Sequence, residues 1–210
     1  MKILLIAATA LEIQSFLNDG QVDVLICDVG SPVTVYHLTK KLSENKYDII
    51  IQAGIGGTFT KKIKTGEVVI IKQDAFGDIG VEEKEEFKTV FQLGFGDENK
   101  FPFDKGWLKN TNEILNNIQL KKVNGITVNK ISDKKKQTKQ LIKKFKAAVE
   151  SMEGAAFHYV CLMEKVPFLQ VRSISNKVGE RDKKKWRIQE AIENLNEELE
   201  IIFTYLNRNN

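Results

Sequence analysis

The sequence predicts an α/β protein in which helices pack against a mixed central sheet. The first part of the chain alternates between apolar runs typical of strands and amphipathic segments typical of helices, and the pattern returns later. The length of 210 residues fits one domain with a sizeable core. We therefore expect residues 1–210 to form a single domain.

The N-terminus is predicted to form a buried strand followed by a helix. Residues 2–8 form a continuous run rich in leucine and isoleucine, which is typical of a strand buried on both faces. Residues 9–17 fit a helix, because Thr9 and Glu12 occupy the two positions of a capping box. Glu12 therefore follows the C-terminal end of a strand, where open α/β sheets bind their ligands.

The next predicted elements lead to a glycine-rich segment. Residues 22–29 and 47–52 are predicted strands, with a helix over residues 31–42 between them. The second strand continues into AGIGG, which contains Gly54, Gly56 and Gly57. These glycines fit either a tight turn in the sheet or a close approach of the backbone to an anion or a ribose. Their spacing differs from the GxGxxG of dinucleotide sites.

The rest of the chain adds strands and helices around one irregular segment. Strands are predicted over residues 67–72, 125–131 and 168–174, and helices over 149–161 and 189–206. The last helix presents an apolar core face, since Ile192, Leu195 and Leu199 recur at helical spacing. Residues 76–107 are rich in glycine and aromatic residues, and we expect an irregular, functional insertion there.

Composition argues against several classes of function. The net charge of +4, from 32 basic and 28 acidic residues, is too small to indicate a nucleic-acid-binding protein. Cys27 and Cys161 have no metal-site or disulfide spacing, so we expect no bound metal and a reducing, cytoplasmic location. No apolar stretch reaches the length of a membrane span, and the short apolar run at the N-terminus lacks a cleavage site.

The segment from residue 151 to residue 176 is the most informative about function. Glu153 falls in the first turn of a predicted helix, where a carboxylate can cap the helix or accept both hydroxyls of a ribose. The strand that follows ends in Arg172, Ser175 and Asn176. An arginine and an amide at the end of an apolar strand are costly to bury without partners, so the pattern favours a polar ligand site.

Four motifs occur in the order of a known family. The sequences LLIAATALEIQ, AGIGG, ESMEGAA and RSISN together resemble the nucleoside phosphorylase and nucleosidase superfamily over most of the chain. Glu153 and Asn176 are 23 positions apart, the spacing that nucleosidases keep between the ribose-binding and base-binding residues. The resemblance implies a nucleoside phosphorylase-like fold, a single-domain three-layer sandwich with helices flanking a mixed central sheet.

One departure within these motifs concerns the base. Nucleosidases that act on adenine nucleosides carry aspartate where this chain has Asn176. A carboxylic acid suits the 6-amino group of adenine, whereas a carboxamide donates to N7 or O6 and suits a 6-oxopurine. The segments SISNKVGERDKKKWRIQEA and DAFGDIGVEE are similar to the futalosine hydrolase branch, although the region before AGIGG is shorter here. The resemblance therefore implies hydrolysis of futalosine, a hypoxanthine nucleoside, on the route to menaquinone.

The resemblance also implies roles for individual residues. Glu12 would activate water for attack on C1′, and Glu153, helped by the Met152 backbone, would hold the ribose hydroxyls. Arg172 would position the water or the carboxylates. The residues that would hold the base and the rest of the substrate are Asn176, Ser175, Gly54, Ile131, Ser132, Arg181 and Trp186. The implied ligands are a purine nucleoside and water, with no cofactor or metal, in a homodimer or higher homo-oligomer.

Other interpretations remain open at this point. A methylthioadenosine/S-adenosylhomocysteine nucleosidase would share the two glutamates and the arginine, but Asn176 opposes it. A nucleoside-binding or storage protein that has lost the chemistry is opposed by the retention of Glu12. A phosphorylase would need arginines near AGIGG to bind phosphate, and only lysines, Lys61 and Lys62, follow that segment.

Overall fold

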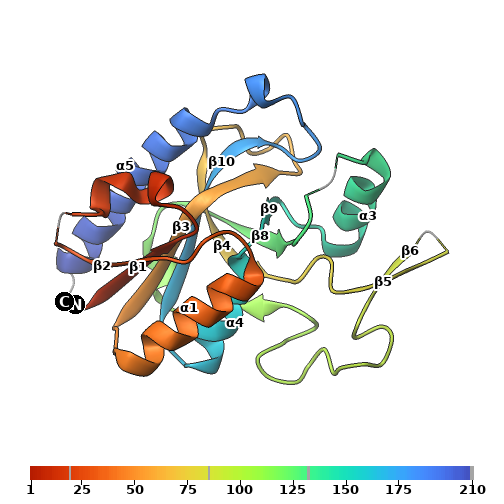
Figure 1. Ribbon diagram of the computed structural model, residues 1–210, viewed down its shortest axis with the longest axis horizontal. Helices are drawn as coiled ribbons and strands as arrows, with labels where there is room; N and C mark the ends of the chain where they lie inside the picture. The colour runs from red at the N-terminus through yellow and green to blue at the C-terminus, as the bar shows by residue number, and fades with distance from the viewer. Residues whose placement is uncertain (19, 85, 132, 209–210) are drawn as a thin grey trace.

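The core of the protein is one mixed sheet (Figure 1). The computed structural model describes residues 1–18, 20–84, 86–131 and 133–208. Within these residues seven strands follow the order β10-β4-β8-β9-β3-β1-β2, and β7 pairs with β4. The strands are β1 (Ile3–Ala7), β2 (Asp23–Ile26), β3 (Ile49–Thr58), β4 (Val68–Asp74), β7 (Leu108–Lys109), β8 (Lys121–Thr127), β9 (Val149–Ser151) and β10 (Phe168–Lys177).

The N-terminal strands run in parallel. Leu4 of β1 lies opposite Asp23 of β2 on one side and Ile50 of β3 on the other. Helix α1 (Ser31–Glu44) forms the crossover between β2 and β3. Strand β1 is buried along its whole length, which explains why its sequence is an unbroken apolar run.

Strand β10 joins two parts of the sheet. It pairs in parallel with β3 and antiparallel with β4. Strands β8 and β9 connect β4 back to β3, so these five strands close into a ring. The predicted mixed sheet is therefore confirmed, and its closure places Arg172 of β10 opposite Gly54 of β3.

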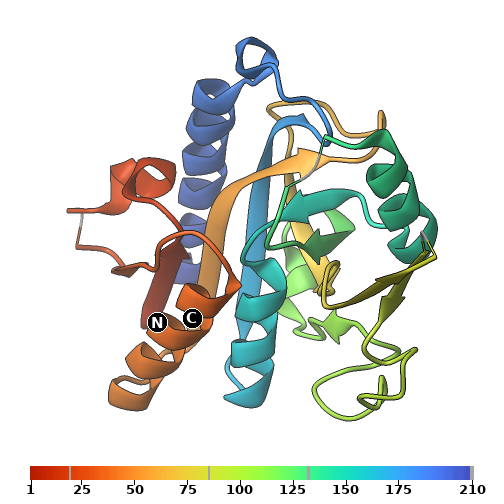
Figure 2. The same cartoon turned by 45° about the vertical axis from the view of Figure 1, so that its right-hand side comes forward.

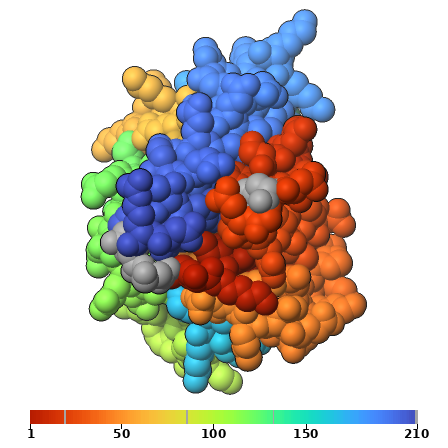
Figure 3. All heavy atoms as spheres, turned by 90° about the vertical axis from the view of Figure 1, so that its left-hand side faces the viewer, coloured from red at the N-terminus to blue at the C-terminus, as the bar shows by residue number. Residues whose placement is uncertain are grey.

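Helices cover both faces of the sheet, which confirms the three-layer arrangement (Figure 2). Helix α5 (Ile188–Arg208) packs through Leu195 and Leu199 against the face that carries Leu5. Helices α1 and α4 (Gly154–Met163) cover the face that carries Leu4. Figure 3 shows α5 against the N-terminal segment, where Asn196 Nδ2 donates to the carbonyl of Glu12 at 2.9 Å.

Of the two interpretations left open for AGIGG, the structure excludes the tight turn. The segment lies inside β3, which continues to Thr58. Its backbone pairs with β10 along one edge and with β9 at Gly57 on the other. Glycine is locally free to turn, but pairing on both edges holds the segment extended.

Other predicted elements also differ from the structure. The helix predicted over residues 149–161 begins only at Gly154, because Val149–Ser151 pairs with β3 and β8 as strand β9. The strand predicted over 125–131 covers Lys121–Thr127 instead. The first helix is a 3₁₀ helix, η1 (Ala10–Phe16), with a kink at Ile13.

The insertion over residues 76–107 is largely irregular, as expected, but it contains a two-stranded hairpin. Strands β5 (Gly80–Glu83) and β6 (Glu86–Thr89) pair only with each other in the described sheets. Helices α2 (Ile114–Asn117) and α3 (Lys135–Phe145) follow the insertion, and a short 3₁₀ helix, η2 (Lys183–Lys185), precedes α5. Among the residues that the structure describes, no helix is long and apolar enough to cross a membrane.

Candidate functional site

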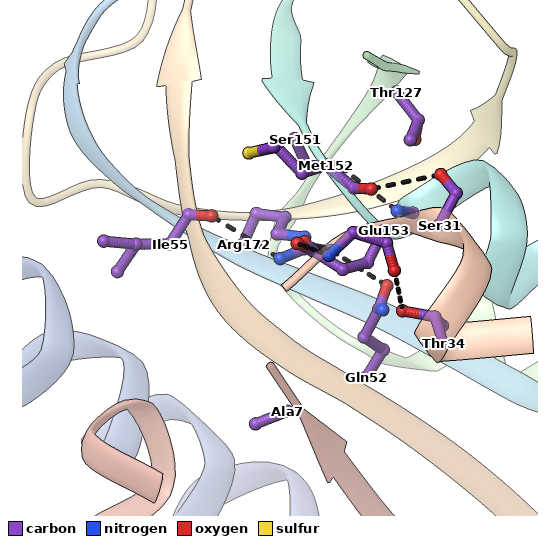
Figure 4. Close-up of polar contacts among 12 residues, drawn as sticks. Ala7, Ser31, Thr34, Gln52, Ile55, Thr127, Ser151, Met152, Glu153 and Arg172 are labelled. Carbon is purple, nitrogen blue, oxygen red and sulfur yellow. Dashed lines mark hydrogen bonds and ion pairs between the residues drawn. The ribbon is translucent and has the colours of Figure 1, made fainter. Parts of the chain in front are cut away.

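Arg172 occupies the centre of the candidate site (Figure 4). Its side chain is almost fully buried, with 1% of the residue exposed. Nη2 donates to Oε1 of Gln52 at 3.0 Å and lies 3.5 Å from Oε2 of Glu153. Nη1 lies 3.5 Å from the carbonyl oxygen of Ile55. The guanidinium is therefore held between β3 and the start of α4.

Gly54 leaves the space that this arrangement needs. A Cβ atom at Gly54 would collide with Nη1 of Arg172 and would lie 3.0 Å from Oε1 of Glu12. Gly54 is one of the predicted substrate-binding residues, and the structure places it next to the side chains of Arg172 and Glu12. Absence of a side chain, rather than freedom to turn, is what the position requires.

Glu12 borders the same space above Gly54 as Arg172. Its Oε2 accepts hydrogen bonds from the backbone N–H of Thr9 at 3.0 Å and from the Thr9 hydroxyl at 3.2 Å. Its Oε1 accepts from the backbone N–H of Ile55 at 3.0 Å. The predicted pairing of Thr9 with Glu12 is therefore present, and it fixes a buried carboxylate at the end of β1.

Glu153 directs its carboxylate toward the same centre. It is the N-cap residue of α4, yet its Oε1 accepts from the backbone N–H of Gly30 at 3.1 Å. Burial raises the pKa of Glu153, Arg172 lowers it, and the nearby Glu12 raises it again. Two carboxylates and one guanidinium thus share a small buried volume.

Several residues of the site were not predicted from the sequence. Gln52 holds the guanidinium, Gly30 holds Glu153, and the Ser31 hydroxyl donates to the carbonyl of Met152 at 3.1 Å. Gln52 had a readable signal, because it is an amide directly after the apolar residues 49–51. Gly30 and Ser31 had none, since their partners lie more than a hundred residues away.

Asn176 lies further along β10. Ser175 donates from its hydroxyl to Oδ1 of Asn176 at 2.8 Å, and Nδ2 of Asn176 donates to the carbonyl of Lys177 at 2.9 Å. A Cβ atom at Gly57 of β3 would lie 3.6 Å from this Nδ2. The amide of Asn176 therefore lies beside Gly57 of β3, which has no side chain to fill the space next to it.

The other predicted residues lie on segments outside β3, β10 and α4. Arg181 and Trp186 lie together on the segment after β10, with the guanidinium 5.7 Å from the ring centroid. The indole N–H of Trp186 donates to the carbonyl of Glu180 at 2.9 Å. Ile131 is 41% exposed, and Ser132 lies outside the described residues.

The side chains of the site provide several kinds of polar contact. Glu12 and Glu153 offer carboxylate oxygens as bases or hydrogen-bond acceptors, and Arg172 is a buried cation near both. Further along β10, the amide of Asn176 offers a hydrogen-bond donor. Within the described part of the chain, no group of His, Cys, Asp and Glu is arranged to hold a metal ion.

The family model of the phosphorylase superfamily matches residues 13–208. Futalosine hydrolase from Thermus thermophilus is 29% identical over 167 residues, which cover 78% of this chain and 73% of that protein. Futalosine hydrolase from Streptomyces coelicolor is 30% identical over 151 residues, covering 72% of this chain and 63% of that protein.

Solved structures show the same fold. A 5'-methylthioadenosine/S-adenosylhomocysteine nucleosidase from Colwellia psychrerythraea, in complex with adenine, superposes with a TM-score of 0.81 at 18% identity. The match covers 97% of this chain and 95% of that one. The fold, the order of the motifs and the family match agree, and the chain belongs to the phosphorylase superfamily.

Proposed function

We propose that this protein hydrolyses the N-glycosidic bond of futalosine and releases hypoxanthine, in the cytoplasm, as a step toward menaquinone. The observation that carries the proposal is the combination of the buried Glu12, Arg172 and Glu153 with an amide, Asn176, at the far end of β10. The two glutamates support glycosidic hydrolysis, and the amide supports a 6-oxopurine base. Similarity to two futalosine hydrolases points the same way.

Glu12 is proposed as the base that activates water. Three N–H and O–H donors fix its carboxylate, whose two oxygens still have a lone pair for one water. Water held there would lie beside Arg172, on the same side of Gly54. Removing its proton as it attacks C1′ is general base catalysis.

Glu153 is proposed to hold the ribose hydroxyls. As the glycosidic bond breaks, the sugar acquires oxocarbenium character, and a nearby carboxylate stabilises this positive charge. Arg172 favours the charged form of Glu153, because its positive charge opposes the rise in pKa that burial causes. Arg172 thus affects the reaction indirectly, through the charge and position of the Glu153 carboxylate.

Asn176 is proposed to bind the departing base. The Ser175 hydroxyl donates to Oδ1, so the NH₂ end of the amide faces away from Ser175. One of its two N–H groups donates to Lys177, and the other remains for N7 or O6 of hypoxanthine. Charge that builds on the leaving base is stabilised by such a donor.

The test is an assay of the purified protein on futalosine and on methylthioadenosine, each with and without phosphate. We expect hypoxanthine release to exceed adenine release and not to depend on phosphate. Faster release of adenine would favour the nucleosidase alternative. A requirement for phosphate would indicate a phosphorylase, and binding without turnover would indicate a storage protein.

Arg181 and Trp186 are proposed to contact the benzoate-bearing tail of the substrate. Their stacked arrangement offers a cation and an aromatic face, which suit a carboxylate on a ring. Arg181→Gln should raise KM for futalosine several-fold and leave KM for inosine, which lacks the tail, unchanged. Equal effects on both substrates would remove Arg181 from the tail site.

A homodimer or higher homo-oligomer is also part of the proposal. Apolar side chains are exposed around the start of α1, where Val29 is 55% and Tyr36 is 61% exposed. Exposed apolar groups that gather on one surface are typical of association sites. Sedimentation of the purified protein tests this, and a monomer at micromolar concentration would refute it.

A further inference from the structure

Glu153 occupies a position whose side chain usually caps a helix. It is the N-cap residue of α4, and an N-cap side chain commonly accepts from the backbone N–H two or three positions on. Glu153 makes no such bond to its own helix. Its carboxylate turns instead to Gly30 and Arg172.

Other residues accept hydrogen bonds from the backbone N–H groups in the first turn of α4, which Glu153 does not cap. The backbone N–H of Ala155, two positions after the N-cap, donates to the hydroxyl of Thr127 at 2.6 Å. The N–H of Gly154 lies 3.3 Å from the hydroxyl of Ser151. Thr127 is the last residue of β8 and is fully buried, and Figure 4 shows it near the start of α4.

Asp74 orients the Thr127 hydroxyl. Thr127 donates to Oδ1 of Asp74 at 3.0 Å, so a lone pair of the hydroxyl oxygen is left for Ala155. The backbone N–H of Ala75 also donates to this Oδ1, at 2.8 Å. Asp74 is fully buried, and burial raises its pKa to about 6.

Asp74 Oδ2 occupies space that two glycines leave free. This oxygen lies against Gly125 and Gly154, and a Cβ atom at Gly154 would collide with it. A negative charge at the N-terminus of α4 is also favoured by the helix dipole. The carboxylate is therefore held against the first turn of the helix.

We propose that Thr127, oriented by Asp74, caps helix α4 in place of Glu153 and so keeps the Glu153 carboxylate in the active site. Both are positioning residues, because they reach the chemistry only through Glu153. Without the Thr127 hydroxyl, the free N–H of Ala155 competes with Gly30 and Arg172 for the Glu153 carboxylate. The proposal rests on the proposed ribose-binding role of Glu153.

The experiment compares a hypoxanthine ribonucleoside with its 2′-deoxy analogue. For each variant, the ribose preference is kcat/KM for the ribonucleoside divided by kcat/KM for the 2′-deoxy analogue. This ratio measures how strongly Glu153 binds the 2′-hydroxyl. Thr127→Val removes the hydroxyl at nearly constant volume, and Thr127→Ala removes it if valine does not fold. Thr127→Ser restores the hydroxyl. Ser173→Ala is the matched control, because Ser173 Oγ is buried without a hydrogen-bond partner among the described residues.

We expect Thr127→Val or Thr127→Ala to reduce the ribose preference by about tenfold, the effect of losing a hydrogen bond to a charged group. Thr127→Ser should restore it, and Ser173→Ala should leave it unchanged. A variant that loses only thermal stability and keeps the wild-type ribose preference would overturn the proposal.

Glu153→Gln separates this inference from the function on which it rests. If Glu153→Gln reduces the ribose preference but the Thr127 variants do not, only the capping inference is wrong. If Glu153→Gln leaves the preference unchanged, the ribose-binding role of Glu153 is wrong and the inference falls with it. If hypoxanthine nucleosides are not cleaved by wild-type protein, the proposed function itself is wrong, together with this inference.

Discussion

Replacing Arg172 by methionine should destabilise the protein in a pH-dependent manner. The change keeps an apolar stem in the core but leaves Glu12 and Glu153, 7% and 5% exposed, without their buried cation. Breaking a buried ion pair typically costs about 3–5 kcal/mol. The 3.5 Å separation between Arg172 and Glu153 favours the lower end of this range. For a chain of this length, about 3 kcal/mol lowers Tm by roughly 6–12 °C.

The sign of the pH dependence follows from Glu153. Burial already raises its pKa above the ordinary value of 4.5, and removing Arg172 raises it further. A carboxyl whose pKa is higher in the folded state stabilises the fold below its unfolded pKa, and this contribution is lost as pH rises through the folded value. The deficit of Arg172→Met relative to wild type should therefore be largest near pH 8 and shrink toward pH 5.

Thermal unfolding of both proteins from pH 5 to pH 8 measures this difference. Arg187→Met is the control, because Arg187 pairs with Glu190 at 2.9 Å on the surface. Exposed pairs contribute at most about 1 kcal/mol, so this control should unfold close to wild type at every pH. A deficit in Arg172→Met that stays constant with pH, or that grows toward pH 5, would refute the reasoning.

Three further changes test the site. Glu12→Gln should reduce kcat by about 10²–10⁴-fold while a substrate analogue still binds, and an unchanged rate would remove Glu12 from the mechanism. Asn176→Asp should raise the ratio of adenine to hypoxanthine release by about tenfold, measured as kcat/KM on both nucleosides; an unchanged ratio would contradict the base assignment. Gly54→Ala should destabilise the protein by about 1–3 kcal/mol and reduce kcat, because its Cβ would displace Arg172; wild-type kcat and Tm would show that the site tolerates the methyl group.

The predictions that the structure confirms rest on local patterns. The apolar run at the N-terminus is strand β1, and the spacing of Ile192, Leu195 and Leu199 does mark the core face of α5. Periodicity of this kind depends only on neighbours along the chain. The spacing of Thr9 and Glu12 is another local signal, and their hydrogen bonds are present.

The predictions that failed depended on pairing between distant segments. AGIGG is a strand because β9 and β10 bind its two edges, and neither partner can be read from the glycines. The helix at Ser151 starts late for the same reason, since Val149–Ser151 pairs with β3 and β8. Local preference was overruled by hydrogen bonds that only the closed sheet supplies.

The sequence alone predicted the α/β class, the resemblance to the superfamily, and the candidate residues Glu12, Glu153, Arg172 and Asn176. All three predictions depend only on the type and order of residues along the chain. Only the tertiary structure decided how the set is held. Gln52 and Gly30 reach their charged partners across more than a hundred residues. The physical reason is that a buried charge needs donors and acceptors in three dimensions, and the chain supplies them wherever the sheet brings its segments together.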